Sequence, residues 1–149
     1  MESILKKIID KLNERENEAF FRFEKGAFEI MLDRKPIDII PIIESNFFYV
    51  FEIKKASPSK GILRENFNHY EIFNDYVLSG ASAISVITEP EFFSGSKSYL
   101  SDLRKLSALP LLRKDFIIHP YQIYESYTLG ADFVLLIAAC LECDELKKL

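Results

Sequence analysis

Glycine, cysteine and tryptophan are scarce in this chain, and their scarcity excludes several kinds of protein. The 149 residues include 5 glycines and no tryptophan, and no Gly-x-Gly-x-x-Gly or Gly-x-x-x-x-Gly-Lys pattern is present. A dinucleotide-binding sheet or a Walker-type phosphate loop is therefore not expected. The 2 cysteines, Cys140 and Cys143, form a lone Cys-x-x-Cys without a second pair or a histidine partner. We interpret them as reduced thiols, and we expect neither a metal nor a cofactor.

An excess of basic residues and a long apolar run are also missing. The chain has 19 Lys and Arg against 23 Asp and Glu, a net charge of -4, which argues against a nucleic-acid-binding surface. No apolar run approaches the roughly 18 residues that cross a bilayer, and the first residues lack the apolar core of a secretory signal. With 48% hydrophobic residues, the sequence predicts a globular, cytoplasmic protein that binds neither nucleic acid nor membrane.

Apolar and amphipathic segments alternate along most of the chain. Strands are predicted at about 47–54, 83–88, 110–114 and 132–138, and helices at about 67–79, 96–106, from Pro120 to Gly130, and from Glu142 onward. Nearly continuous apolar strands that alternate with helices are typical of a parallel sheet in an α/β protein. Before them, apolar residues recur at helical spacing, namely Ile4, Leu5, Ile8, Ile9 and Leu12, and predict a helix. Residues 37–43 suggest a short helix or turn. We divide the chain into an N-terminal helical extension, 1–46, and an α/β part, 47–149.

The stretch from residue 48 to Gly61 carries the strongest functional signal. Glu52 and Lys54 interrupt the end of an apolar strand at alternate positions, so they share one face. Charges inside an apolar strand are costly unless they are paired or face a wet cavity. Lys114 ends another apolar strand in the same way. A lone lysine at a strand end often only extends to solvent, but the carboxyl ends of such strands are also where barrel and open α/β enzymes hold their catalytic groups.

Several motifs in register resemble the indole-3-glycerol phosphate synthase family. They are Phe-Glu-Ile-Lys-Lys-Ala-Ser-Pro-Ser-Lys-Gly at 51–61 and the segments 85–89, 92–96, 110–118 and 130–138. The resemblance runs from about residue 48 to the last residue. It implies a (β/α)8 TIM-barrel fold, of which about the first four β-α units are present after the N-terminal extension. It also implies a carboxy-lyase of tryptophan biosynthesis, which closes the ring of 1-(2-carboxyphenylamino)-1-deoxyribulose 5-phosphate and decarboxylates it.

The resemblance assigns roles to the charged residues at the strand ends. It makes Lys114 the general acid at the substrate's ketone oxygen, where negative charge develops during ring closure. Lys54 would bind the substrate carboxylate and share the acid work, and Glu52 would orient Lys54 and help to hold the substrate hydroxyls. A partly desolvated lysine beside a second ammonium is a better acid near neutral pH. Arg113 and Asp115, on the opposite strand face, are expected to be structural.

Four further residues correspond to family positions that bind substrate. Ser57 matches a position close to substrate and phosphate, although a serine before proline is often only a turn residue. Phe93, Phe116 and Leu135 match positions that line the pocket for the anthranilate ring. Without the resemblance, each of these three would be assigned to the core. His119, before Pro120, is expected to cap a helix.

The length sets limits on this interpretation. A complete barrel needs about 250 residues, and the family's general base, asparagine, serine and phosphate site lie on later strands than the four expected here. We therefore expect a truncated synthase that is inactive alone, or else a catalytically inactive half-barrel that only folds or assembles. Two copies could associate through the open edges of the first and fourth strands. A third interpretation, the isomerase of the same pathway, is disfavoured because that enzyme lacks the Glu-x-Lys-x-x-Ser-Pro-Ser turn.

Overall fold

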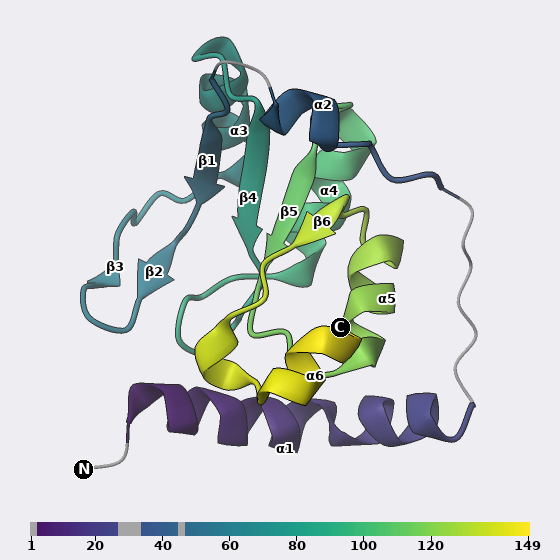
Figure 1. Cartoon of the computed structure of the whole chain (residues 1–149). Coiled ribbons are helices and arrows are strands. Elements are labelled where there is room, and N and C mark those ends of the chain that lie inside the picture. The colour runs from purple at the N-terminus through teal and green to yellow at the C-terminus, as the bar shows by residue number, and fades with distance from the viewer. Residues whose placement is uncertain (1–2, 27–33, 45–46) are drawn as a thin grey trace.

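A parallel sheet with helices on one face forms the centre of the molecule in the computed structural model, which describes residues 3–26, 34–44 and 47–149 (Figure 1). Its strands are β1 (Val50–Ile53), β4 (Ala83–Ile87), β5 (Leu111–Lys114) and β6 (Phe133–Val134), in the order β1-β4-β5-β6. Each neighbouring pair is parallel. The helices α3 (His69–Leu78), α4 (Lys97–Leu106) and α5 (Pro120–Thr128) connect successive strands. The predicted β-α alternation and parallel pairing are confirmed.

The hydrophobic core lies between the sheet and the connecting helices. Ile84 and Val86 of β4 pack there with Leu100 and Leu103 of α4, and all four are 0% exposed. The strands alternate, so the other face of the sheet carries the side chains of Glu52, Ser85, Leu112 and Lys114. That second face becomes polar toward the carboxyl ends of the strands, where the candidate site is found.

The predicted helix ends agree with the structure because local caps fix them. Ser96 caps α4 by accepting the N–H of Ser98, and His119 caps α5 by accepting the N–H of Tyr121. After α5 the chain turns at Gly130, which has a φ of +97°. A Cβ there would lie 2.5 Å from Cγ of Arg104, so only glycine fits without a shift of that arginine.

The strands are shorter than predicted. β6 ends at Val134, and Ala138–Cys140 forms a 3-10 helix rather than the end of the expected strand 132–138. The turn after β1 is a small antiparallel hairpin of β2 (Ala56–Ser57) and β3 (Gly61–Ile62), which the sequence analysis missed. The last helix, α6 (Cys143–Lys148), begins just after Glu142, and both cysteines are free thiols.

The N-terminal region reaches both ends of the sheet. Helix α1 (Ile4–Glu24) continues well beyond the predicted apolar pattern, with Ile8, Leu12, Glu16 and Phe20 buried at a spacing of four. It lies across the carboxyl ends of the strands, whereas the short helix α2 (Ile40–Ile43) lies at their amino ends (Figure 1). The predicted boundary at residue 46 falls outside the described residues. None of the helices in the described ranges is long and apolar enough to span a membrane.

One carboxylate fastens the segment between α1 and α2 to the sheet. Oδ1 of Asp132 accepts hydrogen bonds from Arg34 at 2.6 Å and from the N–H of Ile37 at 2.9 Å. Oδ2 accepts from Arg104 at 2.7 Å and from the N–H of Leu111 at 2.9 Å. Burial would raise the pKa of Asp132, but these hydrogen bonds and the charge of Arg104 outweigh burial and hold the pKa below its usual value.

Candidate active site

A pocket of about 140 Å³ opens where the strands end. It is lined by Glu52, Lys54, Ile87, Glu89, Phe93, Lys114, Asp115, Phe116 and Ile137. These residues come from the carboxyl ends of β1, β4 and β5 and from the segment after β6. The structure therefore brings together the three residues predicted to be catalytic and two of those predicted to bind substrate.

The remaining two predicted residues lie outside the lining of this pocket. Ser57 sits in the β2–β3 hairpin and is half-buried. Leu135 follows β6 and is 39% exposed. The hairpin nevertheless adjoins the pocket, because the N–H of Ala56 donates to the carbonyl of Phe93 at 3.1 Å. Contact of Ser57 and Leu135 with substrate stays a prediction.

Glu52 joins the two lysines. Its Oε2 accepts a hydrogen bond from Nζ of Lys114 at 2.6 Å, and its Oε1 lies 2.8 Å from Nζ of Lys54. The predicted contact of Glu52 with Lys54 is confirmed, and the contact with Lys114 is an additional one. The parallel register explains this meeting, because Glu52 pairs with Ser85 in β4 and Lys114 with Ile87, so all the groups reach the same end.

The electrostatics of this trio favour an anion. Burial would raise the pKa of Glu52, but the hydrogen bonds and charges of Lys114 and Lys54 outweigh burial and place the pKa below its usual value. The carboxylate is thus ionised near neutral pH. One negative charge against two ammonium groups leaves the trio with a net charge of about +1. Such a site can bind a carboxylate or donate a proton to an oxygen that becomes negative.

Two phenylalanines supply the apolar part of the pocket. The rings of Phe93 and Phe116 have their centroids 6.3 Å apart, with 44° between their planes. They come from the segments that follow β4 and β5, and both are half-buried. An apolar slot beside a cationic trio matches an aromatic substrate that carries a carboxylate.

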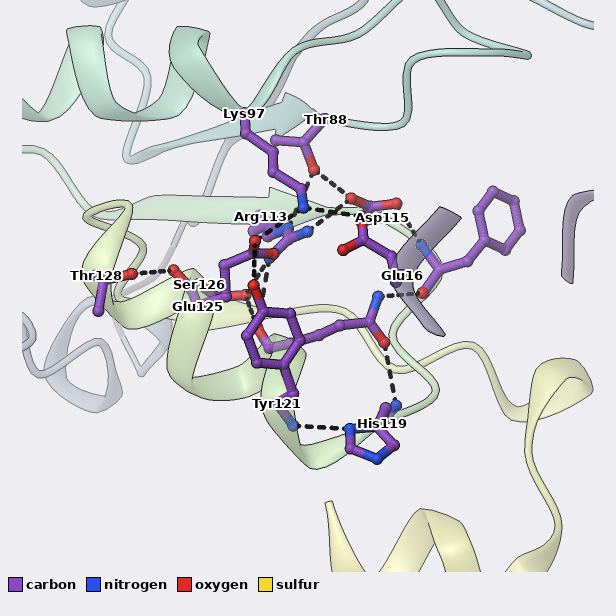
Figure 2. A network of polar contacts seen from close by, with 12 residues as sticks. Glu16, Thr88, Lys97, Arg113, Asp115, His119, Tyr121, Glu125, Ser126 and Thr128 are labelled. Carbon is purple, nitrogen blue, oxygen red and sulfur yellow. Dashed lines mark hydrogen bonds and ion pairs between the residues drawn. The ribbon is translucent and has the colours of Figure 1, made fainter. Parts of the chain in front are cut away.

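A buried ion-pair network supports the strand that carries Lys114 (Figure 2). Arg113, on the opposite face of β5, is 1% exposed and binds Asp115 at 3.0 Å and Glu125 of α5 at 2.8 Å. Asp115 in turn accepts from the hydroxyl of Thr88 at 2.5 Å and from the N–H of Phe116 at 2.9 Å. The structural role expected for Arg113 and Asp115 agrees with this burial and these contacts.

The network extends from the sheet to helix α1. Nζ of Lys97, at the start of α4, lies 2.8 Å from Glu125 and 2.9 Å from Glu16 of α1. Burial would raise the pKa of Glu125, but Arg113 and Lys97 outweigh burial and lower it. Charged groups from α1, α4, α5 and β5 therefore form one connected set. The sequence analysis did not predict that these groups contact one another.

Parallel strands joined by helices, with a charged pocket at the carboxyl ends, define an α/β protein of the kind that holds active sites at this end of its sheet. Comparison with known proteins gives the particular family. A sequence model of indole-3-glycerol phosphate synthase matches residues 1–149. The chain belongs to the indole-3-glycerol phosphate synthase family, whose fold is the TIM barrel.

Individual relatives agree with this assignment. The chain is 48% identical over 132 residues to the indole-3-glycerol phosphate synthase of Ruminiclostridium cellulolyticum, a match that covers 88% of this chain and 51% of the relative. It is 44% identical to the enzyme of the same name from Sulfurimonas denitrificans and 45% identical to that from Campylobacter hominis, covering 100% of this chain and 58% of each relative. The chain thus spans about half the length of the curated relatives it matches.

Proposed function

We propose that this chain supplies the acid side of an indole-3-glycerol phosphate synthase active site. The observation that carries the proposal is the trio in which Glu52 holds the ammonium groups of Lys54 and Lys114, 2.8 Å and 2.6 Å from its two oxygens. The substrate is 1-(2-carboxyphenylamino)-1-deoxyribulose 5-phosphate. Its phenyl ring packs against Phe93 and Phe116, and its carboxylate lies near Lys54.

The chemistry begins with ring closure. The ring carbon that bears the carboxylate forms a bond to the ketone carbon, and the ketone oxygen takes a proton from Lys114. Loss of carbon dioxide returns the electrons to the aromatic ring, and loss of water from the new alcohol then gives the indole. Placing an ammonium where the oxygen becomes negative lowers the barrier to the first step. Glu52 keeps that ammonium in place, because its shared hydrogen bonds fix both lysine side chains.

The elimination of water needs a base as well as an acid. Among the described residues that line the pocket, each carboxylate is already engaged: Glu52 with the lysines, Asp115 with Arg113, and Glu89 with backbone amides. We infer that the first four β-α units of a barrel are present, with β1 and β6 at the open edges. The base would then come from a strand that pairs beyond these edges.

A fluorescence assay of indole product tests the proposal. The chain is expressed alone, and also joined to the part of the Ruminiclostridium cellulolyticum relative that the match leaves out. We expect turnover from the joined protein and none above background from the chain alone. Turnover by the chain alone would contradict the inference that these four strands lack the base. A joined protein that is folded but gives no indole product would support the alternative, a half-barrel that only folds or assembles.

A further inference from the structure

Glu89 is a buried acid in the pocket wall to which the chemistry above gives no role. It lies two residues beyond the end of β4 and is 4% exposed. Its Oε1 accepts the N–H of Glu91 at 3.0 Å, and its Oε2 accepts the N–H groups of Phe92 at 2.7 Å and Phe93 at 3.1 Å. One carboxylate therefore holds three successive backbone amides of the loop that carries Phe93.

The backbone closes the same loop from its other end. The N–H of Gly95 donates to the carbonyl of Glu89 at 2.7 Å. A Cβ on Gly95 would lie 2.5 Å from the carbonyl oxygen of Ile87, so the loop passes too close to β4 to admit a side chain there. The loop is thus a tight structure built around Glu89, and it contains Phe93.

Helix α1 reaches this loop from outside the pocket. Nη1 of Arg15 lies 3.5 Å from Oε1 of Glu89 and 3.7 Å from Oε1 of Glu91. The next residue of α1, Glu16, binds Lys97, which follows the loop directly at the start of α4. Neighbouring residues of α1 therefore contact the loop at its beginning and just after its end.

We propose that Glu89 is a positioning residue for recognition of the substrate's aromatic ring, and that Arg15 couples its loop to helix α1. A buried carboxylate is costly unless it is hydrogen-bonded, and bonds to an ionised acceptor are stronger than neutral ones. The three hydrogen bonds from backbone amides fix the backbone of Phe92 and Phe93, so the ring of Phe93 stays opposite Phe116. Both oxygens of Glu89 are occupied, so it acts through Phe93 and does not itself exchange a proton with substrate. The identity of the ring as substrate depends on the proposed function.

Amide hydrogen exchange in the 149-residue chain tests the positioning without any turnover. Glu89→Gln keeps the size of the side chain but replaces one acceptor oxygen with a donor. We expect exchange of the Phe92 and Phe93 amides to accelerate by about tenfold. The matched control is Glu91→Gln, in the same loop, whose side chain is 41% exposed; it should change these two amides by less than about twofold.

Two further variants keep the test decisive. Glu89→Asp retains the charge but is one methylene shorter, so it cannot reach all three amides and should give an intermediate acceleration. It replaces Glu89→Gln as the test if that variant does not fold. Arg15→Met should accelerate the same amides, but less than Glu89→Gln, because the carboxylate remains in place. Unchanged exchange at Phe92 and Phe93 in a folded Glu89 variant would overturn the proposal.

Kinetics of the joined protein then test the link to recognition. We expect Glu89→Gln to raise KM for the carboxyphenylamino substrate by about tenfold while kcat changes less than about threefold. The pH profile of kcat should not move, because the trio of Glu52, Lys54 and Lys114 is unchanged, and Glu89→Asp should bring KM part of the way back. A fall in kcat with unchanged KM would overturn the recognition role. If the unmutated joined protein shows no turnover, the proposed function fails. The exchange data still test whether Glu89 positions the loop that carries Phe93.

Discussion

Replacing Arg113 with methionine measures how strongly the buried ion-pair network holds β5. The guanidinium is 1% exposed and lies 3.0 Å from Asp115 and 2.8 Å from Glu125. Methionine fills much of the same space but carries no charge. Glu125 keeps Lys97 as a partner, whereas Asp115, also 1% exposed, loses its cation. Leaving one buried charge without its partner costs about 3–5 kcal/mol, so Arg113→Met should be strongly destabilising.

Urea and thermal unfolding of the chain at pH 7 provide the assay. For a domain of this size, each kcal/mol shifts Tm by about 2–4 °C, so Tm should fall by about 10 °C. Lys11→Met is the control, because it removes an exposed ion pair. The side chain of Lys11 is 53% exposed, and that of its partner Glu14 is 68% exposed. Exposed pairs contribute about 0–1 kcal/mol, so the control should leave Tm nearly unchanged.

A second substitution separates lost charge compensation from lost packing. Asp115→Asn removes the uncompensated charge but keeps the shape of the side chain. In the Arg113→Met background it should recover about 1 kcal/mol or more. The reasoning would be refuted if Arg113→Met cost no more than Lys11→Met, or if the added asparagine caused a further loss instead of a recovery.

Three other predictions concern the trio and the carboxylate at the amino ends of the strands. In the joined protein, Lys114→Ala should lower turnover about 100-fold or more without a change in Tm. Lys105→Ala, whose side chain is 75% exposed, is the control, and retained activity of Lys114→Ala would remove the acid role. Lys54→Ala should mainly raise KM, and an unchanged KM would contradict the contact with the substrate carboxylate. Asp132 has a folded-state pKa below its unfolded value of about 3.9. Its ionised form therefore stabilises the fold above about pH 4, and this stability is lost as the pH falls through the folded pKa. The urea midpoint should thus fall more steeply with acid in the unmutated chain than in Asp132→Asn, and parallel curves would contradict this.

The sequence predicted those parts of the fold that depend on local signals. Ser96 and His119 are caps that hydrogen-bond to nearby backbone, so the starts of α4 and α5 could be placed within a residue. Strand lengths were less accurate, because pairing with a neighbour decides where a strand ends. The run 132–138 is apolar almost throughout, so its composition does not reveal that β6 ends at Val134 and that a 3-10 helix begins at Ala138.

For the site, charge inside an apolar strand was the useful signal. It identified Glu52, Lys54 and Lys114, and the structure places all three in one pocket. Glu89 shows a related pattern, an acid just after an apolar strand, and could have been found in the same way. Its partners, however, are backbone amides and an arginine on α1, and no residue spacing predicts such contacts.

The bonds that Asp132 receives have a consequence for the order of assembly during synthesis. Its partners Arg34 and Ile37 precede it by 98 and 95 residues. Contacts that close so long a loop form late, because most of the intervening chain must first be ordered. The segment before the first strand is thus made early but secured late, once the start of the fourth strand has left the ribosome.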